Sequence, residues 1–299
     1  MVKPSPTHAR GIARSFMRDL DKVPSQTRFE AWQIIHHCCE AKMNSAVVRS
    51  IFISESERLR KLPPHPADVG RIVARGRTVK ESRIRNALLV PFDIKMRRDK
   101  PGEGQDPEFK DSVVVVIVGD LRIKGKTFAA DTWTAPALMP LHAIARSVER
   151  GGAEPDELGT VVAEALNNAV VAVEAAEGAM KHGDEFLLPA PEGAWICTLT
   201  TTPRNLCSGW IVSGNGGYEA ADEALSIPCA RINTYYPDAW LDENAKNAVR
   251  DFALATNGKA RDWGFNIQKR ENGLMDEKLV AATKACVRNA PKASAKRAE

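Results

Sequence analysis

The feature that most constrains this fold is the valine run VVVVIV at residues 113–118. β-branched side chains lose rotamer freedom in a helix and pack well on a pleated strand, so the run predicts a buried strand. A strand-like segment, LLVPFDIKM, precedes it at 88–96, and TFAADTW follows a Gly-Lys turn at 127–133, which predicts a hairpin. The run is too short to cross a bilayer, which takes about 20 apolar residues as a helix, and we expect no membrane insertion.

Helical periodicity precedes this strand-rich centre. Apolar residues recur every fourth residue from Ile12 to Leu20 and continue through 25–59, so two helices are expected there. Three prolines at 62–66 interrupt the pattern, and residues 67–89 are expected to form one or two basic helices. The first 87 residues are therefore predicted to be a helical, basic region.

Helices and short strands share the rest of the chain. Helices are expected at 141–151, where two glycines end the pattern, and at 156–181 and 242–255. Pro and Gly turns separate the short strands expected in EFLLP, AWICTLTTT, GWIVSG and CARINTYYP. The predicted fold class is α+β, with a helical amino-terminal region (1–87), an α+β domain with an antiparallel or mixed sheet (88–290) and a flexible basic tail (291–299).

Composition excludes several classes of protein. A chain of 299 residues with 43% hydrophobic content can bury a core without covalent staples. Its six cysteines form no CxxC pair, so we expect reduced, mostly buried thiols, no metal site and no cofactor. The basic amino terminus lacks the apolar run of a secretory signal, and we expect a cytoplasmic location.

Three side chains of the helix expected at 141–151 suit chemistry on phosphate. His142, Arg146 and Arg150 stand at i, i+4 and i+8, along one stripe of a helix. Arginine donates bidentate hydrogen bonds to phosphate oxygens, and histidine titrates near neutrality, so the stripe suits metal-free RNA cleavage by the 2′-hydroxyl. The alternative is a solvated face that Arg146 and Arg150 form with Glu149 and Glu154.

Polar residues also mark the strand expected in CARINTYYP. Strict alternation places one set on each face: Arg231, Asn233 and Tyr235 on the first, and Ile232, Thr234 and Tyr236 on the second. Tyrosine can stack on a base, and Thr or Asn can hydrogen-bond a scissile phosphate. The alternative is that these residues are ordinary strand formers.

The two motifs stand in one order: HAIARSVERG, a second helix, short strands and INTYYP. This arrangement resembles the barnase, EndoU, colicin and RelE group of metal-independent ribonuclease domains over about residues 141–240. The resemblance implies an active site with His142, Arg146, Thr234 and Tyr235. His142 would act as general acid or base, with Arg146 and Arg150 stabilising charge on phosphate, RNA as substrate and a protein inhibitor as a conceivable partner.

Positive charge gathers in one window of the sequence. Residues 58–100 contain 13 lysines and arginines against four acidic residues, a net charge of +9 in a chain whose formal charge is +4. An alternative function follows, a non-enzymatic regulator that binds RNA, DNA or a protein through this window. The contact residues would be Arg71, Arg75, Arg77, Lys80, Arg83, Arg85, Arg97 and Arg98, whose helices would attract phosphate without reading bases.

Overall fold

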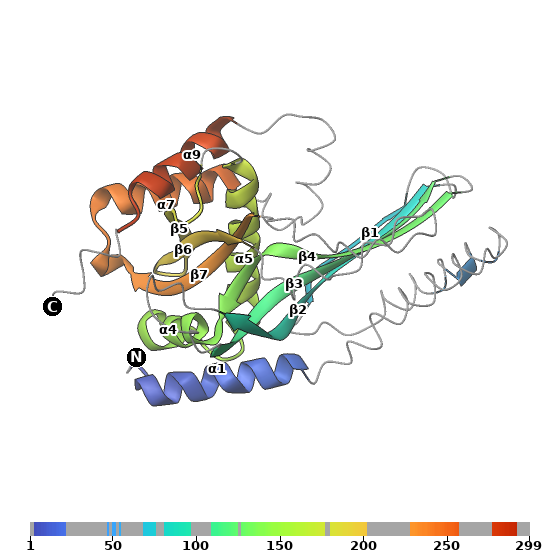
Figure 1. Ribbon diagram of the computed structural model, residues 1–299. Coiled ribbons are helices and arrows are strands. Elements are labelled where there is room, and N and C mark those ends of the chain that lie inside the picture. The colour runs from blue at the N-terminus through green and yellow to red at the C-terminus, as the bar shows by residue number, and fades with distance from the viewer. Residues whose placement is uncertain are drawn as a thin grey trace, which may run out of the picture.

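The structure is a computed structural model, and it describes residues 3–21, 47, 50–51, 54, 68–75, 81–96, 109–124, 127–176, 180–201, 228–256 and 277–291. Helices and one mixed sheet make up this part of the chain, which confirms the α+β class (Figure 1). The strands are β1 (Asp68–Arg75), β2 (Glu81–Met96), β3 (Phe109–Lys124), β4 (Thr127–Pro140), β5 (Glu185–Ala190), β6 (Gly193–Thr201) and β7 (Pro228–Pro237). The helices are α1 (Pro6–Asp21), α4 (Leu141–Gly151), α5 (Leu158–Ala175), α7 (Glu243–Thr256), α9 (Glu277–Arg288) and the short 3-10 helix η1 (Asp238–Trp240).

The sheet consists of two antiparallel halves joined by one short parallel contact. Its strand order is β1-β2-β3-β4-β7-β6-β5. β4 and β7 pair in parallel only at Ala137 with Ala230 and at Leu138 with Arg231. Parallel neighbours require a crossover, and the chain between β4 and β7 supplies α4, α5 and the β5–β6 hairpin.

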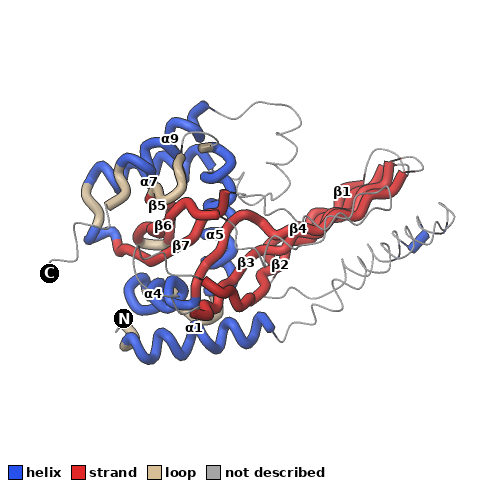
Figure 2. Tube along the Cα trace, in the orientation of Figure 1, coloured by secondary structure: helices blue, strands red, loops and turns tan. Residues whose placement is uncertain are grey.

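The first half of the sheet is a long meander that reaches well beyond the helices (Figures 1 and 2). β2 and β3 pair along their whole length, from Glu81 with Lys124 to Met96 with Phe109. The valine run lies in β3 as predicted, and its residues Val113 to Val116 are fully buried where the meander enters the body. The hairpin predicted between β3 and β4 is also present.

The helices pack on one face of the sheet. Alternate residues of β3 belong to different clusters: Val114 and Val116 join the main core with all five α-helices, whereas Val113 and Val115 join a small cluster on the opposite face. α1 packs on α4 and β2, α5 crosses β4 and β7, and α7 pairs with α9 over β5. Among the described residues, the helices therefore cover β7 from one face of the sheet.

Local sequence explains where α4 stops. Gly152 has φ 67°, in the left-handed region that glycine adopts without penalty, and its N–H bonds to the carbonyl of Ser147. The helix thus ends at the two glycines that marked its predicted end. The helices predicted at 156–181 and 242–255 are confirmed as α5, which spans residues 158–175, and α7, which is shifted by one residue.

α5 is the one described helix that is long and apolar enough to cross a membrane by length and composition. However, 67% of its 18-residue window is buried inside the protein. Asn167 in its middle is also buried, within a core of small and branched apolar side chains. α5 is accordingly the central helix of this fold.

The cysteines that the structure describes agree with the sequence prediction. Cys197, Cys229 and Cys286 are free and buried. Burial raises the pKa of the Cys197 thiol well above its usual range and that of Cys286 to about 12. The Cys197 and Cys286 thiols therefore stay protonated at neutral pH and serve as packing residues.

The helices predicted over 67–89 are wrong. Residues 68–75 and 81–96 are β1 and β2, and the domain boundary expected at residue 87 falls inside β2. The long partner strand β3 offers hydrogen bonds along all of β2, and this pairing overrides a weak helical periodicity. The helix predicted at 25–59, the strand GWIVSG and the tail fall largely or wholly outside the described residues, whereas α9 had no counterpart among the predictions.

Candidate nucleic-acid interface

The phosphate-binding stripe predicted on α4 is not a uniform surface. His142 is exposed in the first turn, and Arg146 and Arg150 follow at half-buried positions. Arg146 forms an ion pair with Glu149 at 2.5 Å, as in the solvated-face alternative. His142 and Arg150 are eight residues apart, about 12 Å along the helix axis. The two ends of the stripe therefore lie in different surroundings.

Arg150 is the member of the stripe that contacts β7. Its guanidinium donates a hydrogen bond of 3.1 Å to the backbone carbonyl of Tyr235. The guanidinium carbon also lies 4.8 Å from the centroid of the Trp240 ring, in cation–π geometry. Burial lowers the pKa of Arg150, and the positive charge of Arg146 lowers it further.

Tyr235 fills the space between α4 and the β5–β6 turn. Its side chain is 1% exposed, its ring meets the Trp195 ring edge-on at 5.5 Å, and its hydroxyl donates to the Pro191 carbonyl at 2.7 Å. Two glycines make room for it, because a Cβ at Gly151 or Gly193 would lie 2.8 Å from the nearest Tyr235 atom. Tyr235 thus contacts α4, β6 and the β5–β6 turn, and its side chain is too buried for an RNA to reach.

The even alternation predicted for β7 is wrong at Asn233. Ile232 pairs with Cys197 and Thr234 with Ile196, so three residues of β7 span two residues of β6. Such a bulge shifts the side-chain phase, which brings Ile232 and Tyr235 to the helix-covered face together. The Asn233 amide donates to the Thr198 hydroxyl at 2.6 Å, a bond that accommodates the extra residue.

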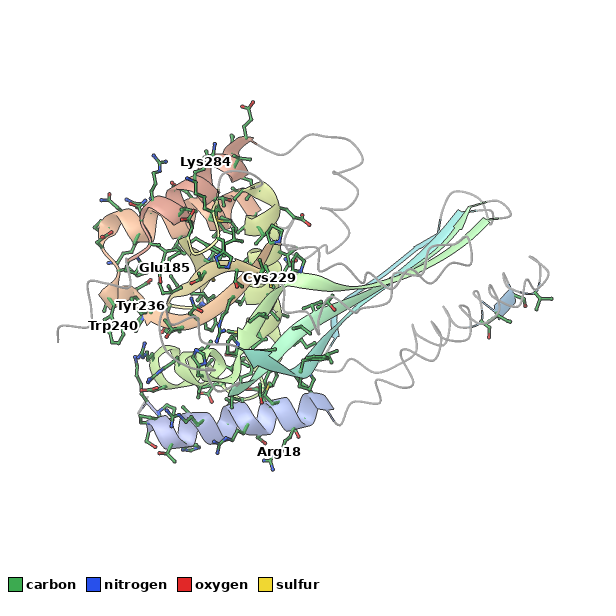
Figure 3. The ribbon with its side chains drawn as sticks, in the orientation of Figure 1. Arg18, Glu185, Cys229, Tyr236, Trp240 and Lys284 are labelled. Carbon is green, nitrogen blue, oxygen red and sulfur yellow. The ribbon has the colours of Figure 1, made fainter. Side chains whose placement is uncertain are left out.

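Thr234 and Tyr236 consequently lie on the face opposite Tyr235. Both are half-buried, and their cross-strand partners are Ile196 and Ala194. The Tyr236 ring meets the Trp240 ring edge-on at 5.6 Å, and the two residues lie together at the end of β7 (Figure 3). Trp240 thus contacts both Arg150 and Tyr236, the neighbour of the tyrosine that the sequence singled out.

These contacts define an aromatic platform of Arg150, Tyr236 and Trp240. Trp240 is 50% exposed, although large apolar side chains are normally buried in a core. η1 positions it, since the Asp238 N–H bonds to the Glu192 carbonyl at 3.0 Å. Lys3 adds a further cation, because its ammonium donates to the Arg150 carbonyl at 2.6 Å. The platform therefore contains a half-exposed indole that η1 holds in place. The Arg150 guanidinium lies over this ring, and the Lys3 ammonium lies at the Arg150 carbonyl.

The basic window supplies strands in place of the predicted helices. Arg71 and Arg75 lie in β1, and Arg83 and Arg85 in β2. The register opposes Arg71 to Asn86 and Ala74 to Arg83, so the arginine positions of β1 and those of β2 belong to opposite faces of the ribbon. The remaining predicted contacts fall outside the described residues: Arg77, Lys80, Arg97 and Arg98.

No protein-family model matches this chain, and neither the curated proteins nor the solved structures searched contain a match. The resemblance to metal-independent ribonucleases stays a prediction. Among the described residues, no group of three His, Cys, Asp or Glu side chains lies close enough to hold a metal ion.

Sequence reasoning missed Tyr236, Trp240 and Lys3 as members of one site. One signal was present, since YYPDAW places three aromatic residues within six positions at the end of a strand. Arg150 and Trp240 are 90 positions apart, and no periodicity connects them. Their meeting depends on the crossover that brings the end of α4 over the end of β7.

Proposed function

We propose that this chain binds single-stranded nucleic acid at the aromatic platform and does not cleave it. The observation that carries the proposal is the half-exposed indole of Trp240, held between the Arg150 guanidinium and the Tyr236 ring. Every base has a π-face, so aromatic stacking binds unpaired bases with little dependence on sequence. A cytoplasmic location, RNA or DNA as the partner and no membrane contact belong to the same proposal.

The positive charges of Lys3 and α1 favour a polyanion as the ligand. Lys3 touches the platform, and α1 continues from it with exposed arginines at every fourth residue, Arg10, Arg14 and Arg18. Among the residues that the structure describes, none forms an ion pair with these three arginines. Like charges at i, i+4 destabilise a helix, and a row of phosphates is the partner that would relieve their repulsion.

The environment of the α4 and β7 residues supports binding over cleavage. Arg146 forms an ion pair with Glu149, and the Tyr235 hydroxyl donates a hydrogen bond to the Pro191 backbone carbonyl. General acid–base catalysis needs groups within hydrogen-bond reach of one reacting phosphate. Arg150 at one end of the helix and His142 about 12 Å away do not form so compact a set.

The experiment is fluorescence anisotropy with labelled 20-nucleotide oligo(dT) and oligo(U). Trp240→Ala should weaken binding by about 5- to 150-fold, since stacking contributes about 1–3 kcal/mol per base. Trp240→Phe should retain part of the affinity because it retains an aromatic face. Native binding should also weaken with added salt, since phosphate contacts release counterions.

Leu254→Ala is the matched control. Leu254 on α7 is 65% exposed, so its removal also deletes exposed apolar surface, and it should leave affinity unchanged. Equal binding by the native protein and Trp240→Ala would contradict the proposal. Cleavage of the oligo(U) in EDTA that His142→Ala abolishes would instead support the ribonuclease prediction.

A further inference from the structure

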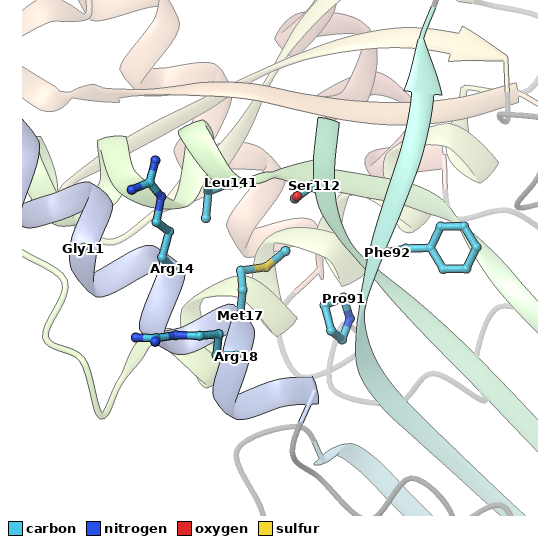
Figure 4. A pocket seen from close by; sticks show the side chains of 8 residues that line it. All are labelled: Gly11, Arg14, Met17, Arg18, Pro91, Phe92, Ser112 and Leu141. Atoms are coloured by element: carbon cyan, nitrogen blue, oxygen red, sulfur yellow. The ribbon is translucent and has the colours of Figure 1, made fainter. Parts of the chain in front are cut away.

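A cavity of about 630 Å³ lies at the carboxyl end of α1, away from the end that carries Lys3 (Figure 4). Met17, Pro91 and Leu141 form its apolar floor, and Ser112 of β3 adds a hydroxyl. The volume lies within the range of small-molecule sites, about 300–1,000 Å³. The cavity is thus large enough for an organic ligand.

The rim of this cavity is cationic. Arg14 and Arg18 line it from successive turns of α1, and no described lining residue is acidic. In Figure 4 the Met17 side chain points into the space between α1 and β2, and the Arg14 guanidinium points toward the start of α4, whereas the Arg18 guanidinium points away from Pro91 and Ser112. A ligand that fits must combine an apolar body with an oxyanion that the Arg14 guanidinium can bind, with Arg18 adding positive charge at the rim.

The amino terminus of α4 favours phosphate as that oxyanion. Leu141 lines the cavity and is the first residue of α4, an 11-residue helix. Its N-cap is Pro140, which makes no side-chain capping hydrogen bond. Uncapped N–H groups and the helix dipole attract anions, and a phosphomonoester carries about −1.5 to −2 charges at neutral pH.

We propose that this cavity is a second binding site, which takes a small phosphomonoester with an apolar or aromatic body, such as a nucleoside monophosphate. The phosphate contacts Arg14 near the start of α4, and the body packs on Met17 and Pro91. The cavity shares Arg14 and Arg18 with the arginine row of α1 but none of the platform residues, and its nearest α1 residue, Gly11, lies eight positions beyond Lys3.

Gly11 provides a variant that closes the cavity. It lines the cavity, and a Cβ built on it meets no atom within 4 Å. A tryptophan at this position has open space for its Cβ, and we expect its ring to obstruct the entrance. Gly11→Ala is the matched control, since one methyl group leaves the entrance open.

Isothermal titration calorimetry of the full chain with AMP and with phenyl phosphate tests the proposal. Both should bind the native protein saturably, and adenosine and inorganic phosphate should each bind at least about 10-fold more weakly, because each lacks one half of the ligand. Gly11→Trp should abolish this binding, and Gly11→Ala should preserve it. Circular dichroism confirms that each variant is folded.

Further variants separate this site from the platform. Arg14→Gln should weaken AMP binding about 10-fold through loss of a charged hydrogen-bond donor, which keeps the test decisive if Gly11→Trp does not fold. Trp240→Ala changes only the platform, so its affinity for AMP at the cavity should equal that of the native protein. The AMP binding lost in Gly11→Trp should therefore be retained in Trp240→Ala. The proposal is overturned if neither phosphomonoester binds, or if Gly11→Trp and Arg14→Gln bind AMP as the native protein does.

Discussion

The end of β7 has an inner and an outer side, and two consecutive tyrosines show how they differ. On the inner side Tyr235 is 1% exposed, touches Trp195 and donates its hydroxyl to the Pro191 carbonyl. On the outer side Tyr236 is half-buried and packs on Trp240, which is 50% exposed. Two adjacent residues therefore have different roles: Tyr235 packs in the core, and Tyr236 belongs to the surface platform.

The difference shows how a strand can serve stability and recognition at once. The bulge at Asn233 sets the phase that turns Tyr235 inward, and alternation then turns Tyr236 outward. Changes on the inner side should lower the free energy of unfolding. Changes on the outer side should alter binding and leave stability nearly intact.

Gly193→Ala should have the largest effect on the inner side. The added Cβ would overlap the Tyr236 carbonyl oxygen and lie 2.8 Å from the Tyr235 hydroxyl. Because the first of these atoms is backbone, relief requires the strand to move, at a cost of about 3 kcal/mol. Urea unfolding measures it, with Gly11→Ala as control, which should stabilise α1 by about 0.5–1 kcal/mol. A native midpoint for Gly193→Ala would show that the inner side is not tightly packed.

Tyr235→Phe should cost about 1–2 kcal/mol, because it leaves the Pro191 carbonyl without its donor. This cost should depend on pH. Burial raises the pKa of Tyr235 from 10.0 to about 12, and the charges of Asp238 and Glu192 add to the shift. The native state then resists ionisation that the unfolded chain accepts, so native stability falls as pH rises from 10 to 12. Unfolding midpoints at pH 8 and pH 11 should show a smaller gap between the two proteins at the higher pH. A constant gap would mean that Tyr235 ionises in the native state as freely as in the unfolded chain.

Elements with strong local signals were predictable from the sequence. The valine run 113–118 favours a strand wherever it lies, and the amphipathic segment 141–151 ends at two glycines that stop a helix. The α+β class follows from such elements. In each case the secondary structure that the residues favour locally is the one that the folded chain contains.

The rest depended on contacts that no local pattern contains. The strand predicted at 88–96 begins at residue 81 because β3 pairs with its whole length, although the charge pattern before residue 88 favoured a solvated helix. The inward turn of Tyr235 depends on a bulge that a strict two-residue repeat cannot express. Arg150 contacts β7 through the Tyr235 carbonyl, its predicted role at phosphate stays a prediction, and its aromatic partner Trp240 comes from beyond the strand.

The smallest change in stability should follow Trp240→Ala on the outer side. The substitution removes the cation–π contact with Arg150 and the edge contact with Tyr236, worth about 1 kcal/mol or less at an exposed site. Urea unfolding should therefore find the variant almost as stable as the native protein, while anisotropy finds its oligonucleotide affinity reduced. A loss near 3 kcal/mol would place Trp240 with Tyr235 as a packing residue, and weaker binding by this variant would then report damage to the fold. A small loss together with weak binding assigns the indole to recognition, because no structural change remains to account for the lost affinity.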